Sequence, residues 1–215
     1  MLLGTERRLI AEHGRRMTSD RLVVGTSGNL SIRTGDLVAV TPTGHAYQTL
    51  TPELVCVHRL DGSAVEAELA PTSELPIHQL IYRLTDARAV VHTHSTAATV
   101  VSTLVDELPT IHYILAVMGG PIRVAPYARF GSPELADGSV AAMADRTGVL
   151  LRNHGATTYG DTLAKAYTRS IYLEWVCKLY HQAKLIGEPT LLSAEQLDEV
   201  AKVIDTYGQA VQRAD

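Results

Sequence analysis

Two histidines, His92 and His94, stand one residue apart in the stretch VHTHS, at the end of an apolar run. Residues i and i+2 of a β-strand point to the same face of a sheet, so a strand here would present both imidazoles on one side. Paired imidazoles can bind one divalent metal ion. The pattern alone is weak, because two polar residues at the end of a strand are more often simply hydrogen-bonded.

A third histidine and a carboxylate extend the possible ligand set. His154, in RNHGATT, follows another apolar run and precedes a glycine, and Glu74, in PTSELPIH, opens a predicted helix. Three imidazoles and one carboxylate would complete a four-ligand site for zinc or manganese. Most of the other six histidines are interpreted as surface or packing residues: His13, His45, His58, His78, His112 and His181.

Three stretches rich in hydroxyl groups and glycine indicate a second kind of site. GTSGNLS, TPTG and PTSE offer hydroxyls and backbone amides, which suit an anion such as a phosphate. Each stretch alone is more typical of an ordinary turn. Thr72 and Ser73 directly precede Glu74, however, so an anion bound there would lie beside the predicted metal ligand.

Composition limits the class of protein. The chain has 215 residues, 46% of them hydrophobic, which suits one large α/β domain or two small ones. A net charge of −4 argues against a nucleic-acid partner, and the chain has neither an apolar run of membrane-spanning length nor a signal peptide. Cys56 and Cys177 are far apart in apolar surroundings, so we interpret them as reduced core thiols of a cytoplasmic protein.

The elements that must position these residues are helices and strands in mixed order. Apolar periodicity predicts helices over 4–19, 74–84, 95–104 (capped by Ser95), 133–146, 161–186 and 193–207. It predicts strand hairpins within 30–44 and 54–66, and single strands over 87–94, 121–128 and 148–160. In 161–186, apolar residues four apart are expected to form one face. We therefore expect one α/β domain of the α+β type over 1–215, with a mostly antiparallel central sheet flanked by helices.

The motifs also resemble a known family over essentially the whole chain. GTSGNLS, TPTG, PTSELPIH, VHTHS, HYILAVMGG, PYARFGSPELA and RNHGATTYG occur in the order and near the spacing of class II, metal-dependent aldolases of the L-fuculose-1-phosphate type. The resemblance implies the class II aldolase/adducin-like fold. It also implies a homotetramer with active sites at the subunit interfaces.

The resemblance further implies roles for individual residues. His92, His94, His154 and Glu74 would hold one divalent ion per subunit, Zn²⁺ first and Mn²⁺ or Co²⁺ as alternatives, with Glu74 also the catalytic acid/base. The phosphate-binding positions would be Gly28, Asn29, Thr43, Gly44, Thr72 and Ser73, where Thr72 replaces a serine common in the family. The substrate pocket would include Thr26 and Phe130.

Two tyrosines have implied catalytic roles. Tyr113 matches a residue that protonates the aldehyde-derived oxygen, and Tyr207 lies in a C-terminal tail, about 207–215, expected to be mobile and to reach a neighbouring site. Tyr82, Tyr127 and Tyr159 match no known role and are interpreted as packing residues.

The implied activity is reversible cleavage of a 1-phosphoketose to dihydroxyacetone phosphate and a small aldehyde. L-fuculose 1-phosphate, which yields L-lactaldehyde, is the first expectation, and a 5-deoxypentulose 1-phosphate salvage aldolase is the main alternative. A methylthioribulose-1-phosphate dehydratase and a ribulose-5-phosphate 4-epimerase belong to the same superfamily, although related epimerases tend to carry aspartate where Glu74 stands. A non-enzymatic adducin-like interaction module is an alternative of another class, and it would be expected to lack the metal histidines.

Overall fold

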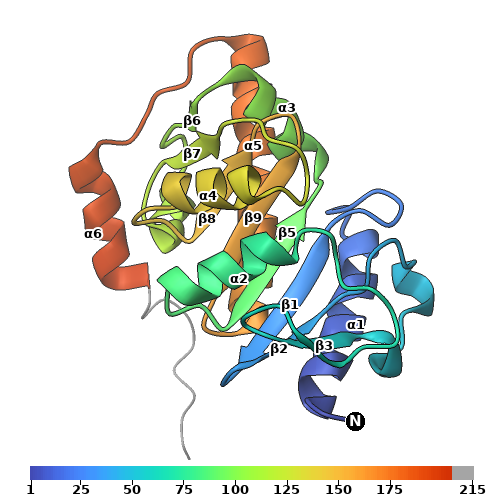
Figure 1. Ribbon diagram of the computed structural model, residues 1–215. Helices are drawn as coiled ribbons and strands as arrows, with labels where there is room; N and C mark the ends of the chain where they lie inside the picture. Colours follow the sequence, from blue (N-terminus) through green and yellow to red (C-terminus); the bar gives the residue numbers. More distant parts are fainter. Residues whose placement is uncertain (205–215) are drawn as a thin grey trace, which may run out of the picture.

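A nine-stranded sheet forms the centre of the computed structural model, in which residues 1–204 are described (Figure 1). The strands are β1 (Asn29–Thr34), β2 (Leu37–Val40), β3 (Cys56–Arg59), β4 (Ala64–Glu66), β5 (Ala89–Thr93), β6 (Glu107–Leu108), β7 (Ile122–Ala125), β8 (Gly148–Leu151) and β9 (Gly155–Gly160). Their order is β4-β3-β2-β1-β5-β9-β8-β7-β6. Of these neighbouring pairs, only β7 and β8 run parallel. The predicted mostly antiparallel sheet and both predicted hairpins are confirmed.

Strand β2 and the first three residues of β5 form unbroken apolar runs because both faces of the sheet are covered there. Val38 and Val40 of β2 pack into one core, whereas Ala39 between them packs into the other. In β5, Val90 and Val91 are likewise divided between the two cores. Successive side chains of a strand point to opposite faces, so an unbroken apolar run is what a strand buried on both sides requires.

Helices form a layer on each face of the sheet. The helices of the described part are α1 (Gly4–Ser19), α2 (Leu75–Leu84), α3 (Thr96–Leu104), α4 (Pro133–Ala142), α5 (Leu163–Ile186) and α6 (Ala194–Ile204), with short 3₁₀ segments η1 (Tyr47–Thr49), η2 (Pro52–Leu54) and η3 (Tyr113–Met118). α2 and α4 pack on one face, and α1, α3 and α5 pack on the other (Figure 1). α6 lies against η3.

The stretch 148–160 was predicted as one strand, and that prediction is wrong. It forms two strands, β8 and β9, which pair with each other across a tight turn. Asn153 in the turn has a φ of 55°, in the left-handed region. Gly155 then approaches β5 so closely that a Cβ atom would lie 2.1 Å from the carbonyl oxygen of Thr93. His154 therefore lies in a turn between two strands, held beside the end of β5.

Two helix ends also differ from prediction. The Ser95 hydroxyl makes no capping bond to α3. The Glu174 carboxylate, from α5, caps this helix instead, by accepting bonds from the amides of Ala97 and Ala98 at 2.9 and 2.8 Å. α4 ends at Ala142, four residues early, and Asp145 then takes a φ of 60°, which a right-handed helix cannot accommodate.

The predicted face of α5 is only partly buried. Leu163 and Tyr167 lie in the core, but Ile171 is 36% exposed and Trp175 is 42% exposed. A stride of four residues advances about 40° beyond one full turn, so each step moves further from the core. The remaining buried residues of α5 follow a mixed spacing of three and four. Apolar residues spaced strictly four apart therefore pass from the buried core to exposed positions on the surface of α5.

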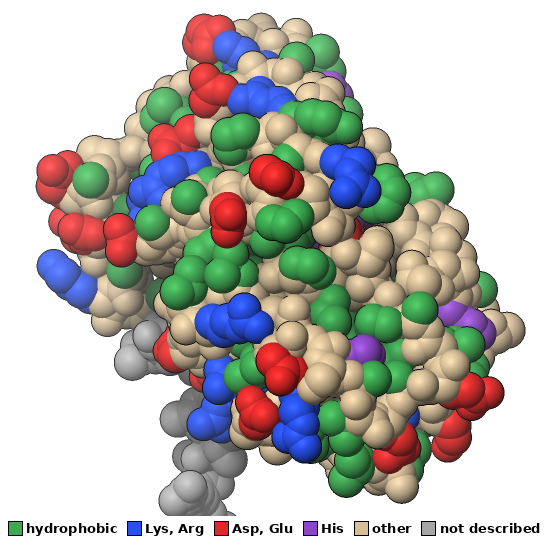
Figure 2. Space-filling view, in the orientation of Figure 1, with side chains coloured by type: hydrophobic (Ala, Val, Ile, Leu, Met, Phe, Trp, Pro, Cys, Tyr) green, Lys and Arg blue, Asp and Glu red, His purple; other side chains and the backbone are tan. Residues whose placement is uncertain are grey.

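Acidic and basic side chains are interspersed over the face that carries α2 and α4 (Figure 2). Cys56 and Cys177 are buried free thiols, as predicted. Within residues 1–204, none of the helices combines the length and apolar character needed to cross a bilayer. The predicted mobile tail and Tyr207 lie outside the described residues.

Candidate active site

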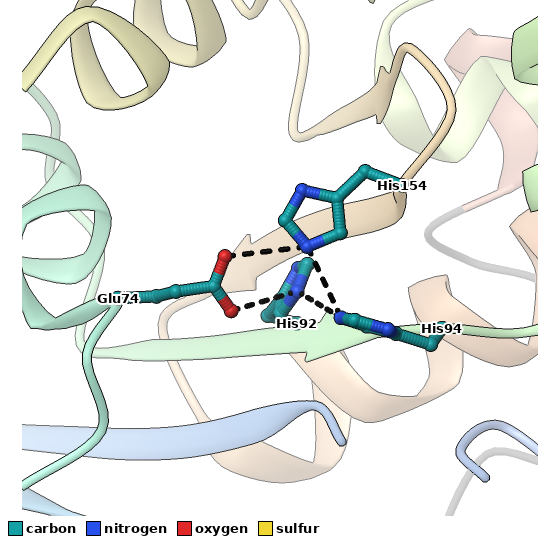
Figure 3. A group of neighbouring side chains, drawn as sticks. All are labelled: Glu74, His92, His94 and His154. Atoms are coloured by element: carbon teal, nitrogen blue, oxygen red, sulfur yellow. Dashed lines mark hydrogen bonds and ion pairs between the residues drawn. The ribbon is translucent and has the colours of Figure 1, made fainter. Parts of the chain in front are cut away.

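Glu74 stands at the start of α2, with its carboxylate turned toward the sheet. It occupies the residue before the first helical turn, in which Pro76 fixes the helical backbone angle. Its backbone amide donates to the Thr72 hydroxyl at 3.2 Å. Its side chain makes no capping bond to the helix. The carboxylate is therefore available to reach the histidines (Figure 3).

The three predicted histidines converge on this carboxylate. His92 is on β5 and His94 directly follows that strand, with 2.9 Å between their Nε2 atoms. His154 comes from the β8–β9 turn, and its Nε2 atom lies 3.1 Å from that of His94. The Glu74 oxygens lie 3.1 Å from Nε2 of His92 and 3.3 Å from Nε2 of His154. The four candidate ligand atoms all lie within 4.8 Å of one another (Figure 3).

The tautomer of His92 follows from its neighbours. Its Nδ1 atom lies 3.0 Å from the backbone carbonyl oxygen of Ala156 and 3.1 Å from the Thr157 hydroxyl. A carbonyl oxygen only accepts hydrogen bonds, so Nδ1 carries the proton and donates it. The lone pair of Nε2 then points toward Glu74 and His94, which is the arrangement of a metal-binding imidazole.

Electrostatics favour neutral His94 and His154 rings beside an ionised Glu74 carboxylate. Burial, reinforced by the neighbouring histidines, lowers the pKa of His94 to about 3 and that of His154 to about 4. Burial alone would raise the pKa of Glu74. The facing His92 and His154 rings and the Asn29 amide outweigh that effect and hold the Glu74 pKa well below its usual range.

This donor set fits a divalent metal ion. Oε1 of Glu74 is buried and accepts no hydrogen bond. Neutral imidazole nitrogens whose lone pairs face one another at 2.9–3.1 Å repel unless a cation or a proton lies among them. One ion bound by His92, His94, His154 and Glu74 would satisfy the orphaned oxygen and remove that repulsion. Three imidazoles and one carboxylate are a ligand set that zinc and manganese accept.

A cavity of about 320 Å³ opens beside Glu74, His94 and His154. It brings together every residue predicted to bind phosphate or line the pocket: Thr26, Gly28, Asn29, Thr43, Gly44, Thr72, Ser73 and Phe130. These residues come from four segments of the chain, at 26–29, 43–44, 72–73 and 130. The cavity thus presents hydroxyl groups and loop backbone directly next to the metal-ligand cluster.

Three lining residues were missed: Pro42, Ala128 and Asn153. Ser27 also lines the cavity, and its hydroxyl belongs to the stretch GTSGNLS that was predicted to bind an anion. Tyr127, interpreted from sequence as a packing residue, is 68% exposed and lines the cavity with Phe130, so that interpretation is wrong. Its position three residues before Phe130 was the available signal.

Tyr113 does not line the cavity beside Glu74. It starts η3, is 50% exposed and lines a separate hollow with Trp175 of α5. A single chain therefore does not bring Tyr113 to the cavity beside Glu74.

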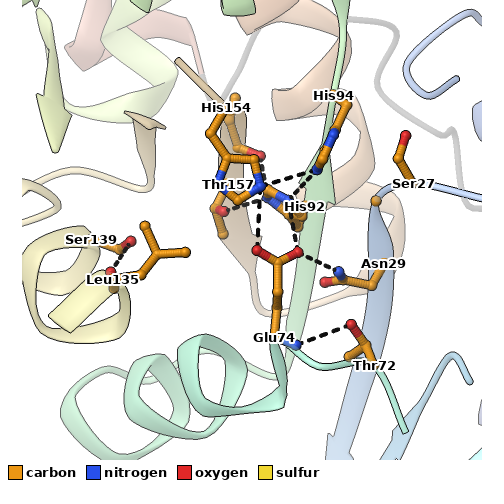
Figure 4. A network of polar contacts seen from close by, with 12 residues as sticks. Ser27, Asn29, Thr72, Glu74, His92, His94, Leu135, Ser139, His154 and Thr157 are labelled. Carbon is orange, nitrogen blue, oxygen red and sulfur yellow. Dashed lines mark hydrogen bonds and ion pairs between the residues drawn. The ribbon is translucent and has the colours of Figure 1, made fainter. Parts of the chain in front are cut away.

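Asn29 and His78 form a polar layer behind Glu74. Asn29 was expected at the phosphate, but its side-chain Nδ2 donates to Oε2 of Glu74 at 3.0 Å (Figure 4). His78 is completely buried and hydrogen-bonds to Asn29 and to Ser31. His78 was predicted only as a surface or packing residue. The signal was its spacing, since residue i+4 lies on the same side of a helix as Glu74.

The fold and the site together define the class of protein. Residues 8–181 match the model of the Class II Aldolase and Adducin N-terminal domain family. The chain belongs to this family, and it carries a cluster of three histidines and one glutamate that could hold a metal ion. It is therefore a class II aldolase-type enzyme, as its motifs predicted.

The chain is also similar to individual aldolases over nearly its whole length. The chain is 42% identical to a 5-deoxy-D-ribulose 1-phosphate aldolase of Bacillus thuringiensis, over 97% of this chain and 100% of that protein. It is 37% identical to the L-fuculose phosphate aldolase of Escherichia coli, over 91% and 92% of the two chains. A solved L-fuculose 1-phosphate aldolase superimposes with a TM-score of 0.91 at 34% identity, covering 94% of this chain and 96% of that one.

Proposed function

We propose that this enzyme reversibly cleaves a 5-deoxypentulose 1-phosphate to dihydroxyacetone phosphate and acetaldehyde. The supporting observation is the 42% identity, over nearly the whole chain, to a 5-deoxy-D-ribulose 1-phosphate aldolase. The sequence motifs had favoured L-fuculose 1-phosphate, whose aldolase is 37% identical. Both substrates share the phosphorylated three-carbon half, so the choice between them concerns only the aldehyde half.

The phosphate of the shared half would occupy the hydroxyl-rich part of the cavity. Thr43, Thr72 and Ser73 line it, and Gly28 and Gly44 supply backbone without side-chain bulk. Gly28 has a φ of 75°, and a Cβ atom there would lie 2.5 Å from a Val23 methyl group, so only glycine fits without rearrangement. Such loops bind an anion through many weak dipoles, and the acidic net charge of the chain does not oppose this.

Glu74 is the proposed proton carrier at C3 of the ketose. It lines the cavity and is ionised at neutral pH. A divalent ion held by the three histidines and Glu74, zinc in our proposal, would act as a Lewis acid toward the ketone and hydroxyl oxygens of the substrate. Glu74 can then deliver or remove the C3 proton, as a general acid or base within reach of that carbon.

The aldehyde half would lie against apolar surface. Phe130 and Tyr127 line the same cavity as Glu74 and are 61% and 68% exposed. Aromatic surface suits the terminal methyl group that both a 5-deoxypentulose and a 6-deoxyhexulose carry. It does not by itself select between acetaldehyde and lactaldehyde.

We also propose a homotetramer in which a neighbouring subunit supplies Tyr113 to the site. Tyr113, Ile171 and Trp175 are large, exposed side chains, and both Trp175 and Tyr113 contact the ring of His112. Exposed apolar surface of this kind marks association sites. A second copy of the chain would cover it and bring the Tyr113 hydroxyl to a cavity that, within residues 1–204, is lined by a single tyrosine, Tyr127.

The test is a comparison of substrates. The zinc-loaded enzyme is incubated with dihydroxyacetone phosphate and either acetaldehyde or L-lactaldehyde, and the products are identified by NMR. We expect a higher kcat/KM with acetaldehyde. A preference for lactaldehyde would assign the enzyme to L-fuculose 1-phosphate, and no carbon–carbon bond formation with either aldehyde would overturn the aldolase proposal.

A further inference from the structure

We propose that His78 is a positioning residue for Glu74: a one-way chain of buried hydrogen bonds through His78 fixes the orientation of the Asn29 amide that holds the Glu74 carboxylate. This inference rests on the proposed role of Glu74 in the active site. It adds three side chains to those that shape the site: His78 and Tyr82 of α2, and Ser31 of β1.

The chain is continuous and buried. The Asn29 amide lies between Oε2 of Glu74 and Nε2 of His78. Nδ1 of His78 lies 2.6 Å from the Ser31 hydroxyl, which lies 2.6 Å from the hydroxyl of Tyr82. Each of the five residues is at most 5% exposed. Glu74, His78 and Tyr82 are spaced four residues apart along α2, so they form one face of the helix against β1.

The direction of every bond follows from its chemistry. Oδ1 of Asn29 can only accept, so Nε2 of His78 carries a proton and donates it. Burial lowers the pKa of His78 to about 3, so the ring is neutral and its Nδ1 must accept. The Ser31 hydroxyl then donates to Nδ1, and the Tyr82 hydroxyl, with its pKa raised by burial, donates to Ser31.

The consequence at the active site is a fixed amide. An asparagine amide can rotate by 180° and exchange its oxygen and nitrogen. In the reversed state Oδ1 would face the Glu74 carboxylate, where two acceptors repel, and the amide nitrogen would face a donor on His78. With His78 in place, only the state in which Nδ2 donates to Oε2 is satisfied at both ends. Oε2 is thereby held, and Oε1 is left facing His154.

The chain orients Glu74 but does not carry its proton. An amide nitrogen does not accept a proton at neutral pH, so Asn29 interrupts any relay from Tyr82 or His78 to the carboxylate. Proton exchange at Glu74 must therefore occur from the cavity side. His78 accordingly acts on the geometry of the reaction and not as a source or acceptor of its proton.

Variants of His78 and of a matched histidine test the proposal. His78→Leu removes both bonds, and His78→Gln restores a donor toward Asn29. The control is His58→Leu. His58 of β3 is also a buried histidine, 4% exposed, and its Nδ1 bonds the main-chain carbonyl of Gly62 in the β3–β4 hairpin. We expect His78→Leu to lower kcat about 10- to 100-fold, because an Asn29 amide that is no longer held would lose its hydrogen bond to the charged Glu74 carboxylate, with KM for the phosphorylated ketose within about twofold. His78→Gln should recover most of kcat, and His58→Leu should retain it.

A second readout does not depend on aldolase activity. Each variant is titrated with Co²⁺, and the visible absorption of the bound ion is followed. We expect weaker binding and an altered spectrum for His78→Leu, but not for His58→Leu. If the enzyme cleaves no phosphoketose, the proposed function fails while this titration still tests the positioning role. Equal Co²⁺ binding and spectra for the two leucine variants would overturn the proposal. If His78→Leu does not fold, Ser31→Ala serves instead: a spectrum altered in the same direction supports the proposal, and an unchanged one overturns it.

Discussion

Replacing Glu74 by glutamine should separate the two roles of this carboxylate. In the structure Oε2 accepts a bond from Asn29 and Oε1 faces His154. Glutamine keeps the shape but exchanges one oxygen for an NH₂ group. If its oxygen faces Asn29, the NH₂ group faces the histidine nitrogens, where it cannot bind a cation. If its oxygen faces the histidines, the NH₂ group meets the Asn29 NH₂ group, and two donors oppose each other.

The variant therefore keeps one of the two interactions and loses the other. A hydrogen bond to a charged group contributes about 1.5–3 kcal/mol. Metal affinity of Glu74→Gln should accordingly fall roughly 10- to 150-fold, so the site refills at saturating metal. Proton transfer should suffer more, because an amide cannot accept the C3 proton. We expect a loss of about 10²–10⁴ in rate, the range of general acid–base catalysis.

The assay isolates the proton step. Enzyme saturated with zinc is incubated with dihydroxyacetone phosphate in D₂O without any aldehyde, and exchange of the C3 proton is followed by NMR. Glu68→Gln, which changes an exposed glutamate, is the control and should exchange at the wild-type rate. If metal-saturated Glu74→Gln exchanges as fast as the wild type, Glu74 is a ligand only and the reasoning is refuted.

Three further predictions concern the phosphate loops, the β9 turn and pH. Ser73→Ala should raise KM for phosphorylated ketose about tenfold or more, by removing a donor to a charged group, with little change in KM for the aldehyde; equal KM values would place the anion elsewhere. Gly155→Ala should lower both the melting temperature and the metal content, because its Cβ atom would overlap the Thr93 carbonyl, whereas Gly187→Ala, with nothing within 4 Å, should alter neither. The folded-state pKa of His78, about 3, lies below its ordinary 6.5, so the unfolded chain binds the extra proton and stability falls as the pH drops from 6.5 toward 3. Urea unfolding at pH 7 and pH 5 should show a loss up to about 2 kcal/mol larger for the wild type than for His78→Gln, and equal losses would contradict this assignment.

The cluster of candidate metal ligands could be predicted from sequence because several of its signals are local. His92 and His94 have the spacing of one strand face, and Glu74 stands at a helix start marked by Pro76. The first two hairpins were predictable for the same reason, since glycine marks each turn. The β8–β9 hairpin was not, because its turn, Arg152 to His154, contains neither glycine nor proline.

The polar layer behind Glu74 could not be predicted because it depends on strand pairing. Asn29 of β1 lies directly opposite His92 of β5 in the sheet. No local pattern says that β1 pairs with β5, which is 55 residues further along the chain from its last residue. Without that pairing, the sequence does not show that the Asn29 side chain bonds to Glu74 or that His78 lies behind it. Tyr127 was likewise misread, because sequence alone does not show which side of a loop faces a cavity.

The ligands of the proposed ion are widely separated along the chain, and this has a thermodynamic consequence. Glu74 and His92 are 18 positions apart, and His94 and His154 are 60 positions apart. The unfolded chain cannot hold these groups together, so an ion that binds them binds only the native state. Free energy of unfolding then rises with the logarithm of free metal concentration, by about 1.4 kcal/mol for each tenfold increase above the dissociation constant. Melting temperatures of this enzyme and its variants are therefore comparable only when they are measured at the same free metal concentration.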